Sequence, residues 1–277
     1  MMKQGIYYPV SGVATIVEAF YKLAVDIGVE FEFNATANSF EYSKGRINAV
    51  RCSNGTRHSA DAFISNLDFF SVQGLLQRRC TVQPSFSYFT IQWGLKNRIS
   101  ELSHHNLVIP LDFEVGFEQL YRGGKFPTRP IVYLNETTGI DPQVAPEGCG
   151  NLFAVVTAPA QNGIWDWKNQ LNEAQSATQS VMESAGIKIE QENVVIEQVQ
   201  SPLTFEKRDG NYKGSLYGEA DHERGFLGLP HTNRDQEYTN LFYCGGSVQP
   251  GAGLPMACLS GKFAVEQLLG TRLKPFS

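Results

Sequence analysis

The sequence predicts a mixed α/β (α+β) fold, and three observations support this prediction. The amino end carries an amphipathic helix and several short strands, the middle is rich in strands and aromatic residues, and the carboxyl end has a strand, a glycine-rich loop and a helix. With 277 residues, 42% of them hydrophobic, the chain can build one large domain or two entwined ones. We expect three zones, at residues 1–76, 77–236 and 237–277.

Residues 1–76 should form one helix followed by a small meander of strands. Ser11 is expected to cap the helix and Gly28 to end it. The apolar residues of the helix should share one side: Val13, Ile16, Val17, Phe20, Leu23, Ala24 and Ile27. The expected strands cover residues 29–33, 40–42, 46–52, 57–58 and 62–65, with turns at Lys44-Gly45 and Asn54-Gly55.

Residues 77–236 should form a second, strand-rich zone with one long helix. Runs of β-branched and aromatic residues predict strands at 85–93, 130–134, 152–157 and 194–196. Apolar residues at helical spacing predict a helix over residues 166–185, ended by Gly186.

The carboxyl-end zone carries the most informative pattern. The apolar run 241–244 predicts a buried strand, stopped by Gly245 and Gly246. Pro255 stands where a helix would begin, a position that tolerates its missing N–H. A loop with few side chains before a helix lets backbone N–H groups approach a ligand closely, which is a way to hold a cofactor. An ordinary strand–loop–helix connection is the alternative, and Met256 replaces the third glycine of the dinucleotide fingerprint.

Composition excludes several classes of partner. The net charge is -5 and no run of Lys or Arg occurs, so no nucleic-acid partner is expected. The five cysteines are scattered and never form a CxxC pair, which fits free thiols in the cytoplasm. We see no signal peptide and no apolar run long enough to span a bilayer, although peripheral membrane contact stays open.

Other clusters give weaker signals. His104 and His105 would point to opposite faces of a strand, so no metal site is expected there. Residues 141–150 are dense in turn formers and predict an ordered loop between two strands. The aromatic segment 113–126 could line an apolar cavity, touch a bilayer or belong to the core. No nucleophile triad or carboxylate pair stands out, so no catalytic residue is assigned.

Taken together, these motifs resemble the bacterial phytoene desaturase family of carotenoid desaturases, within the FAD-dependent amine-oxidase-like flavoproteins. The matching pieces follow the family's order: Gly5-Ile-Tyr-Tyr-Pro-Val-Ser-Gly12, Gly28-Val29, Asn34, Asn48-Ala-Val50, Asp61, Ser65-Asn66-Leu67-Asp68, His104-His105, Asp141-Pro142, Ala145-Pro-Glu-Gly-Cys149, Gly214-Ser-Leu-Tyr-Gly218 and the run from Asn240 to Gly261. Two departures are Ser11 in place of a glycine and Leu67 in place of an alanine.

The resemblance implies a part of an FAD-binding Rossmann-like domain, joined to an antiparallel-sheet substrate domain with helices. The first and third zones would belong to the former and the second zone to the latter. FAD is the implied cofactor. The implied cofactor-binding residues are Thr36 and Ala37 near the adenine end, Gly245, Gly246 and Ser247 by the pyrophosphate and ribityl chain, and Gly253, Leu254, Pro255 and Met256 against the isoalloxazine ring.

The implied activity is desaturation of a long carotenoid, with flavin as the electron acceptor and peripheral membrane contact because the substrate dissolves in lipid. The family's amino-terminal strand–GxGxxG–helix has no counterpart, so we expect a fragment of a longer protein that is inactive by itself. Two alternatives stay open. One is a flavin-dependent carotenoid isomerase or oxygenase of the same family, and the other is a non-catalytic carotenoid or lipid binder.

Overall fold

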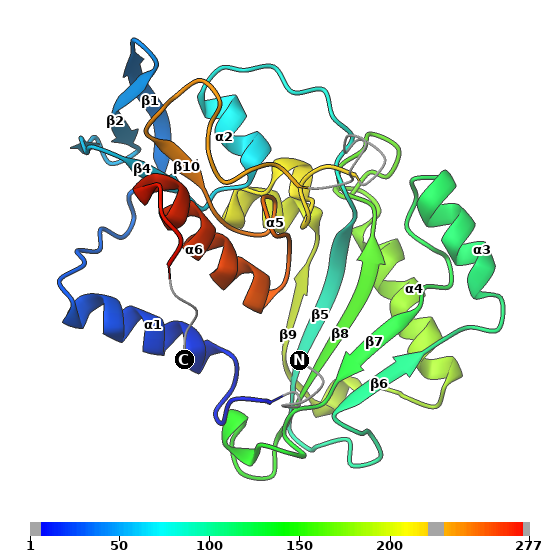
Figure 1. Ribbon diagram of the computed structural model, residues 1–277. Coiled ribbons are helices and arrows are strands. Elements are labelled where there is room, and N and C mark those ends of the chain that lie inside the picture. The colour runs from blue at the N-terminus through cyan, green and yellow to red at the C-terminus, as the bar shows by residue number, and fades with distance from the viewer. Residues whose placement is uncertain (1–6, 221–229, 274–277) are drawn as a thin grey trace.

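Three sheets organise the chain in the computed structural model, which describes residues 7–220 and 230–273 (Figure 1). A small antiparallel sheet contains β1 (Ala37–Ser43), β2 (Arg46–Cys52) and β3 (Arg57–His58). A two-stranded parallel sheet pairs β4 (Phe63–Ser65) with β10 (Leu241–Tyr243). The third sheet has five antiparallel strands in the order β6-β7-β8-β5-β9. The mixed α/β class expected from the sequence is therefore confirmed.

The small sheet follows the predicted turns closely. Lys44 and Gly45 both take positive φ angles, of 50° and 71°, as expected for the tight turn between two antiparallel strands. Ile47 and Ala49 of β2 are buried. They alternate with exposed residues, which is the period of a half-buried strand.

Helix α1 (Ala14–Asp26) matches the prediction at its end but not at its start. Gly28 has a φ of +87°, and the N–H of Val29 donates to the carbonyl of Ala24, which closes the helix as expected. The cap predicted at Ser11 is wrong, because the helix begins after Val13 with no side-chain cap. Ser11 instead donates its backbone N–H to Asp141 at 2.6 Å.

The strand predicted at residues 29–33 is absent from the structure. This segment is extended, but it pairs with no strand among the described residues, so it forms no ladder. The rings of Phe31 and Phe33 stack on each other at 6.0 Å, and Phe31 lies 4.6 Å from the ring of Tyr21 on α1. No residue of α1 is buried, so the predicted apolar side of this helix is exposed.

The parallel pair β4–β10 joins segments far apart in the sequence. Leu241 pairs with Phe63 and Tyr243 with Ser65. The side chain of Asn240 fastens this pair to the small sheet, because its amide accepts from the N–H of Ile47 and donates to the carbonyl of the same residue, at 2.8 and 2.9 Å. The strand predicted at residues 62–65 is confirmed, although Ile64 is exposed and not buried as expected.

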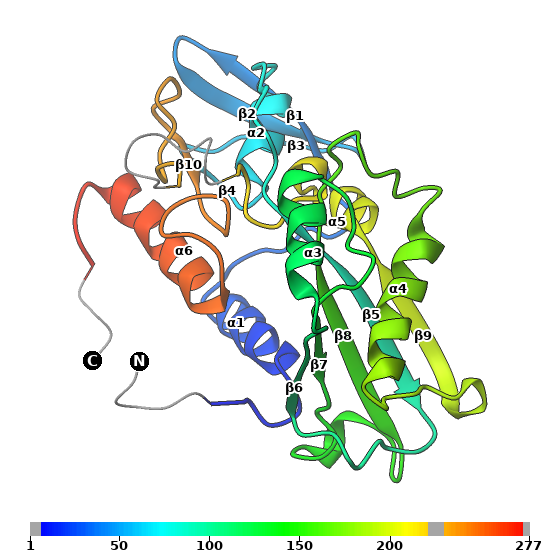
Figure 2. The ribbon, with the colours of Figure 1, turned by 90° about the vertical axis from the view of Figure 1, so that its right-hand side faces the viewer.

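The five-stranded sheet is built from β5 (Ser87–Leu95), β6 (His105–Val108), β7 (Val132–Asn135), β8 (Gly150–Ala158) and β9 (Val194–Gln200). One face packs against α4 (Leu171–Ser184) and forms the largest core, with Phe89, Ile91 and Trp93 of β5 buried. Figure 2 shows α4 on one side of this sheet and α1 and α6 (Leu254–Leu269) on the other. The four predicted strands are confirmed, whereas β6 was not predicted.

Three short helices were also not predicted: α2 (Phe69–Leu75), α3 (Phe113–Phe117), which continues into a π-helical turn over Glu118–Arg122, and α5 (Pro202–Asp209). Short 3-10 turns cover Pro142–Val144, Gln191–Asn193 and Tyr212–Gly214. Helix α4 begins later than expected, at Leu171, because Asp166 accepts from the N–H of Lys168 and holds residues 166–169 in a turn.

Candidate cofactor and substrate site

The glycine-rich loop between β10 and α6 has backbone geometry that favours glycine. Gly245, Gly251 and Gly253 have φ angles of 109°, 123° and 109°. A Cβ atom on Gly245 would also lie 2.7 Å from Oδ1 of Asn66. The loop therefore needs glycine at these three positions for their positive φ angles, and at Gly245 also for the close contact with Asn66.

Hydrogen bonds from three different segments hold the start of this loop. The N–H of Cys244 donates to the carbonyl of Ser65 at 2.9 Å, and the N–H of Gly245 donates to Oγ of Ser260 at 3.0 Å. Ser247 accepts through Oγ from the N–H of Phe69, at the start of α2. The loop is thus fixed to β4, α6 and α2 together.

A buried polar pair, missed by the sequence analysis, completes this support. The side-chain amide of Asn233 donates to the carbonyls of Tyr243 and Gln249, at 3.1 and 2.8 Å. The same amide donates to Oγ of Ser260, which is fully buried. The one signal in the sequence was a serine among apolar residues of the predicted helix.

The start of α6 matches the predicted pattern. Gly253 is the N-cap, Pro255 lies in the first turn, and the N–H of Ala257 donates to the carbonyl of Gly253. The first N–H groups of a helix have no partner within it, and they carry partial positive charge. Gly253, Leu254 and Pro255 are exposed and Met256 is half-buried, so this turn is open to a ligand.

The remaining predicted cofactor residues lie in another sheet. Thr36 is exposed and accepts through its carbonyl from the N–H of Ser53 at 2.8 Å. Ala37 begins β1 and pairs with Cys52. The structure therefore brings Gly245–Ser247 and Gly253–Met256 together in the glycine-rich loop and the first turn of α6, and keeps Thr36 and Ala37 beside or on the small sheet.

A cavity of about 1230 Å³ lies between the glycine-rich loop and the five-stranded sheet. Gly246, Gly251 and Ala252 line it from the loop, and Tyr88 of β5 and Thr157 of β8 line it from the sheet. The described residues that line this cavity include aromatic and apolar side chains together with Arg122, Gln83 and Asn162, but no carboxylate and no imidazole. It can therefore accept a large, mostly apolar ligand next to the loop.

Two tyrosines mark the sheet side of this cavity. The hydroxyl groups of Tyr88 and Tyr217 lie 2.7 Å apart, and the two rings meet edge to face at 6.2 Å. Burial and this hydrogen bond raise the pKa of Tyr217 above its usual value. The two hydroxyl groups therefore form a polar point on an aromatic wall.

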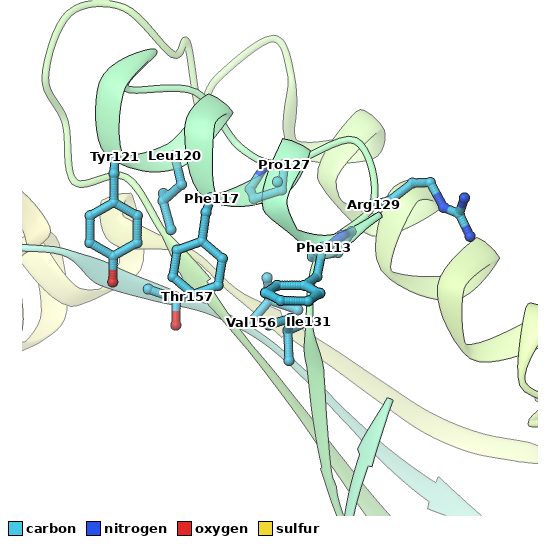
Figure 3. Close-up of a pocket in the computed structure, with 11 residues that line it drawn as sticks. Phe113, Phe117, Leu120, Tyr121, Pro127, Arg129, Ile131, Val156 and Thr157 are labelled. Atoms are coloured by element: carbon cyan, nitrogen blue, oxygen red, sulfur yellow. The ribbon is translucent and has the colours of Figure 1, made fainter. Parts of the chain in front are cut away.

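A smaller cavity of about 70 Å³ adjoins the large one under α3 (Figure 3). Phe113, Phe117 and Ile131 line it, and it shares Tyr121 and Thr157 with the large cavity. The rings of Phe117 and Tyr121 stack at 5.2 Å. The aromatic segment 113–126 thus lines an apolar cavity, while its last residue, Phe126, belongs to the core.

Two buried carboxylates flank the loop in structural roles. Burial raises the pKa of Asp68 to about 6, although the N–H groups of Phe70 and Ser71 donate to its carboxylate and oppose that shift. Burial would also raise the pKa of Asp235, but hydrogen bonds from Arg78 and Tyr243 outweigh it and hold this pKa at about 2. Asp68 caps α2, and Asp235 fixes the segment before β10.

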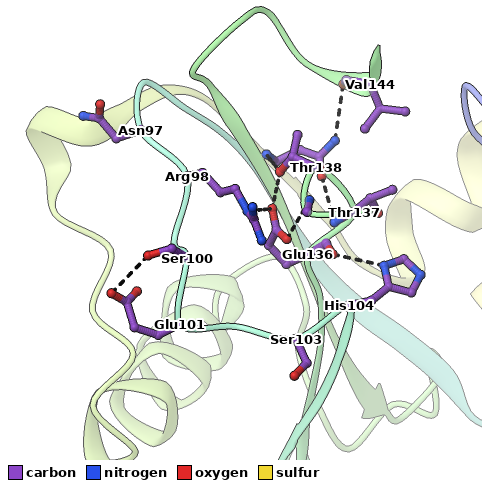
Figure 4. A network of polar contacts seen from close by, with 12 residues as sticks. Asn97, Arg98, Ser100, Glu101, Ser103, His104, Glu136, Thr137, Thr138 and Val144 are labelled. Carbon is purple, nitrogen blue, oxygen red and sulfur yellow. Dashed lines mark hydrogen bonds and ion pairs between the residues drawn. The ribbon is translucent and has the colours of Figure 1, made fainter. Parts of the chain in front are cut away.

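A second polar network lies at the far end of the five-stranded sheet (Figure 4). Buried Glu136 contacts Arg98 at 3.2 Å, accepts from the N–H of Gly139 at 3.0 Å and accepts from the hydroxyl of Thr138. The rings of His104 and His105 lie 4.1 Å apart, so the prediction that they point to opposite faces is wrong. The reason is that His104 precedes β6 and does not follow its alternation.

The possible metal ligands and the cysteines can be compared across residues 7–220 and 230–273. No group of three or more side chains of the metal-ligating types gathers there. All five cysteines are free. Over the same residues, no helix combines the length and the apolar character needed to cross a membrane.

Comparison with known proteins gives a consistent set of relatives. The chain is 31% identical over 275 residues to a 1-hydroxycarotenoid 3,4-desaturase from Flavobacterium, and 29% identical to a zeta-carotene-forming phytoene desaturase from Myxococcus xanthus. It is 26% identical to a 4,4'-diaponeurosporene oxygenase from Staphylococcus haemolyticus. Each match covers 96% of this chain but only 56%, 53% and 55% of the relative. No protein-family model matches the chain.

Solved structures show the same fold at low sequence identity. An oxidoreductase from Methanosarcina mazei matches with a TM-score of 0.62 and 17% identity, covering 95% of this chain and 55% of that one. A putative protoporphyrinogen oxidase from Exiguobacterium matches with a TM-score of 0.57 and 16% identity, covering 93% and 51%. The resemblance to carotenoid desaturases is therefore confirmed, and the chain spans about half the length of its curated relatives.

Proposed function

We propose that this chain supplies the substrate site and one wall of the flavin site of an FAD-dependent carotenoid desaturase. The observation that carries the proposal is the large cavity between the glycine-rich loop and the aromatic sheet wall. A polyene is long and apolar, which suits a cavity whose described lining bears no carboxylate. The names of the relatives support a carotenoid as the substrate.

The loop and the start of α6 have the properties that a flavin needs. Backbone N–H groups and the positive end of the helix at Leu254 and Met256 would stabilise negative charge on a reduced ring. Gly245, Gly246 and Ser247 would lie along the pyrophosphate and ribityl chain, and Thr36 and Ala37 near the adenine. When bound, FAD would supply the acceptor for the electrons removed from a C–C bond. The chain's own residues would shape and orient the polyene against it.

The proposed domain boundaries follow the three sheets. Residues 1–76 and 237–277 would belong to the flavin-binding domain, and residues 77–236 to the substrate domain. About 45% of each relative has no counterpart in this chain. We therefore propose that a segment corresponding to this part of the relatives supplies the rest of the flavin site. This chain would be inactive without that segment.

Membrane contact is proposed at the segment around α3. Leu111 is completely exposed, and Val115, Phe117 and Tyr121 of the same segment are exposed as well. These side chains stand beside the small cavity under α3, so a polyene dissolved in lipid could enter there. Replacing both Leu111 and Val115 with Asp should abolish co-sedimentation with lipid vesicles, whereas unchanged co-sedimentation would refute this contact.

A joined protein tests the proposed function. In this fusion protein, residues 1–277 would replace the matched part of the Myxococcus xanthus desaturase. They would follow the segment of that enzyme that has no match in this chain. The purified protein should carry flavin and should convert phytoene into products with more conjugated double bonds, and the unmatched segment alone should not. A folded, flavin-bound protein that neither binds nor converts any carotenoid would refute the proposal.

Product analysis of the same protein separates the two reactions found among the relatives. A desaturase yields a longer conjugated system without new oxygen, whereas an oxygenase, as several relatives are named, yields oxygen-bearing products. Mass spectrometry of the extracted carotenoids distinguishes the two. The residues that line the cavity favour neither reaction.

A further inference from the structure

The face of the five-stranded sheet opposite α4 carries a row of polar side chains across three of its strands. Strand register places Gln92 of β5 between Gln198 of β9 and Phe153 of β8, and Phe153 beside Asn135 of β7. Residues two apart on a strand share a face, so Gln92 lies on the same face as Tyr88, which lines the large cavity. One face therefore joins the aromatic wall to the polar row.

A pocket of about 390 Å³ opens at this row. Gln92, Asn135, Thr137, Asn151 and Gln198 contribute to its lining, together with Phe153 and Ile196. Gly94 belongs to the same pocket, and a Cβ atom there would lie 2.6 Å from Cγ2 of Ile196. Glycine at this position thus allows Ile196 to lie across the strand and form an apolar wall.

The polar side chains of the pocket fall into two groups. Asn135 donates to the carbonyl of His104 at 2.9 Å and accepts from Thr137 at 2.6 Å, so its amide is already used. For Gln92 and Gln198, no side-chain hydrogen bond is found within the described part of the chain. Two neighbouring amides, each able to donate and to accept, are therefore available to a ligand.

Thr90 gives a second, independent indication that a ligand approaches the same face of the sheet. It lies between Tyr88 and Gln92 on β5, and its side chain is almost fully buried. Its hydroxyl oxygen has no hydrogen-bond partner among the described residues. A buried polar atom without a partner is costly, which indicates that an additional group approaches this face.

We propose that this pocket binds an oxygen-bearing end group, a hydroxyl or a carbonyl, of the polyene, a proposal that rests on the function proposed above. Gln92 is four residues beyond Tyr88, which places it about 14 Å along the strand from the large cavity. A rod-like polyene that crosses the cavity would span this distance. Its oxygen-bearing end would hydrogen-bond with Gln92 and Gln198.

The same geometry should discriminate against a hydrocarbon end. A hydrocarbon would remove water from the two amides without replacing the lost hydrogen bonds, whereas a hydroxyl or carbonyl would replace them. Gln198 is exposed and Gln92 is half-buried, so we expect a preference of about tenfold, as for one hydrogen bond.

The test compares two probes on the purified chain in detergent: lycopene, and a lycopene derivative with one terminal hydroxyl. Binding is followed by quenching of tryptophan fluorescence, because Trp93 follows Gln92 on β5 and its buried indole lies on the α4 side of the same strand. The natural chain should bind the hydroxylated probe about tenfold more tightly. The double variant Gln92→Leu, Gln198→Leu should lose this preference and still bind lycopene. The control Gln191→Leu, on an exposed turn, should keep the preference.

Each result has a distinct meaning. Equal affinity of the natural chain for both probes, or a preference that survives in the double variant, would overturn the end-group site but leave the proposed function intact. If neither probe binds the natural chain, the proposed function and the end-group site both fail. Circular dichroism of each variant establishes that the fold is retained.

Discussion

The side-chain amide of Asn233 lies 3.0 Å from Oγ of Ser260, and both side chains are buried behind the glycine-rich loop. The serine hydroxyl also accepts the N–H of Gly245. One oxygen thus joins the segment before β10, the loop after it and helix α6. This junction holds in place the loop whose residues Gly246, Gly251 and Ala252 line the cavity.

Ser260→Ala should destabilise the chain by about 2 kcal/mol, because it leaves the buried N–H of Gly245 without its acceptor and removes one of the acceptors of the Asn233 amide. Urea unfolding followed by tryptophan fluorescence measures this change. Ser184→Ala removes a serine hydroxyl from an exposed position on α4, and should change the free energy of unfolding by less than about 0.5 kcal/mol. Equal effects of the two substitutions would contradict the role assigned to Ser260.

Two glycines of the loop offer a matched pair, because Gly245 and Gly253 share a φ of 109°. Alanine at either position carries the same backbone strain, of about 1–3 kcal/mol. Only Gly245→Ala adds a contact, at 2.7 Å from Asn66, whereas nothing lies within 4 Å of a Cβ on Gly253. Gly245→Ala should therefore lower the free energy of unfolding more than Gly253→Ala. Equal losses would show that the contact with Asn66 is not tight.

Asp68 should make the stability depend on pH. Its folded pKa of about 6 exceeds the ordinary value of about 4, so the native state binds more protons between these values. The free energy of unfolding should therefore fall as pH rises from about 4 to about 6, by up to about 3 kcal/mol. Asp68→Asn keeps an acceptor for the N–H groups of α2 and should flatten this part of the profile. Parallel pH profiles for the natural chain and the variant would contradict the assignment.

Local chemistry explains the elements that the sequence predicted correctly. The turn at Lys44-Gly45, the apolar run of β10 and Pro255 at the start of α6 depend on neighbours in sequence. Helix α2 escaped prediction although its cap, Asp68, is a local signal, because seven residues are too few to show helical periodicity. Residues 29–33 have the alternation of a strand, but a strand needs a partner, and none lies beside them among the described residues.

Part of the candidate site was predictable because it, too, depends on residues that are neighbours in sequence. Glycines and a proline at a helix start marked the loop from Gly245 to Met256. The hydrogen bonds of Asn233 could not be predicted, because its partner Ser260 is 27 residues away and a serine among apolar helix residues does not indicate which residue it bonds. The polar row at Gln92 depends on the register of three strands, which only the folded sheet defines.

A crystal structure of the joined protein with FAD and a polyene tests the central claim most directly. We expect the isoalloxazine ring against Gly253–Met256 and the polyene in the cavity between Ala252 and Tyr88. Density for the polyene in another part of the molecule, with this cavity empty, would contradict it.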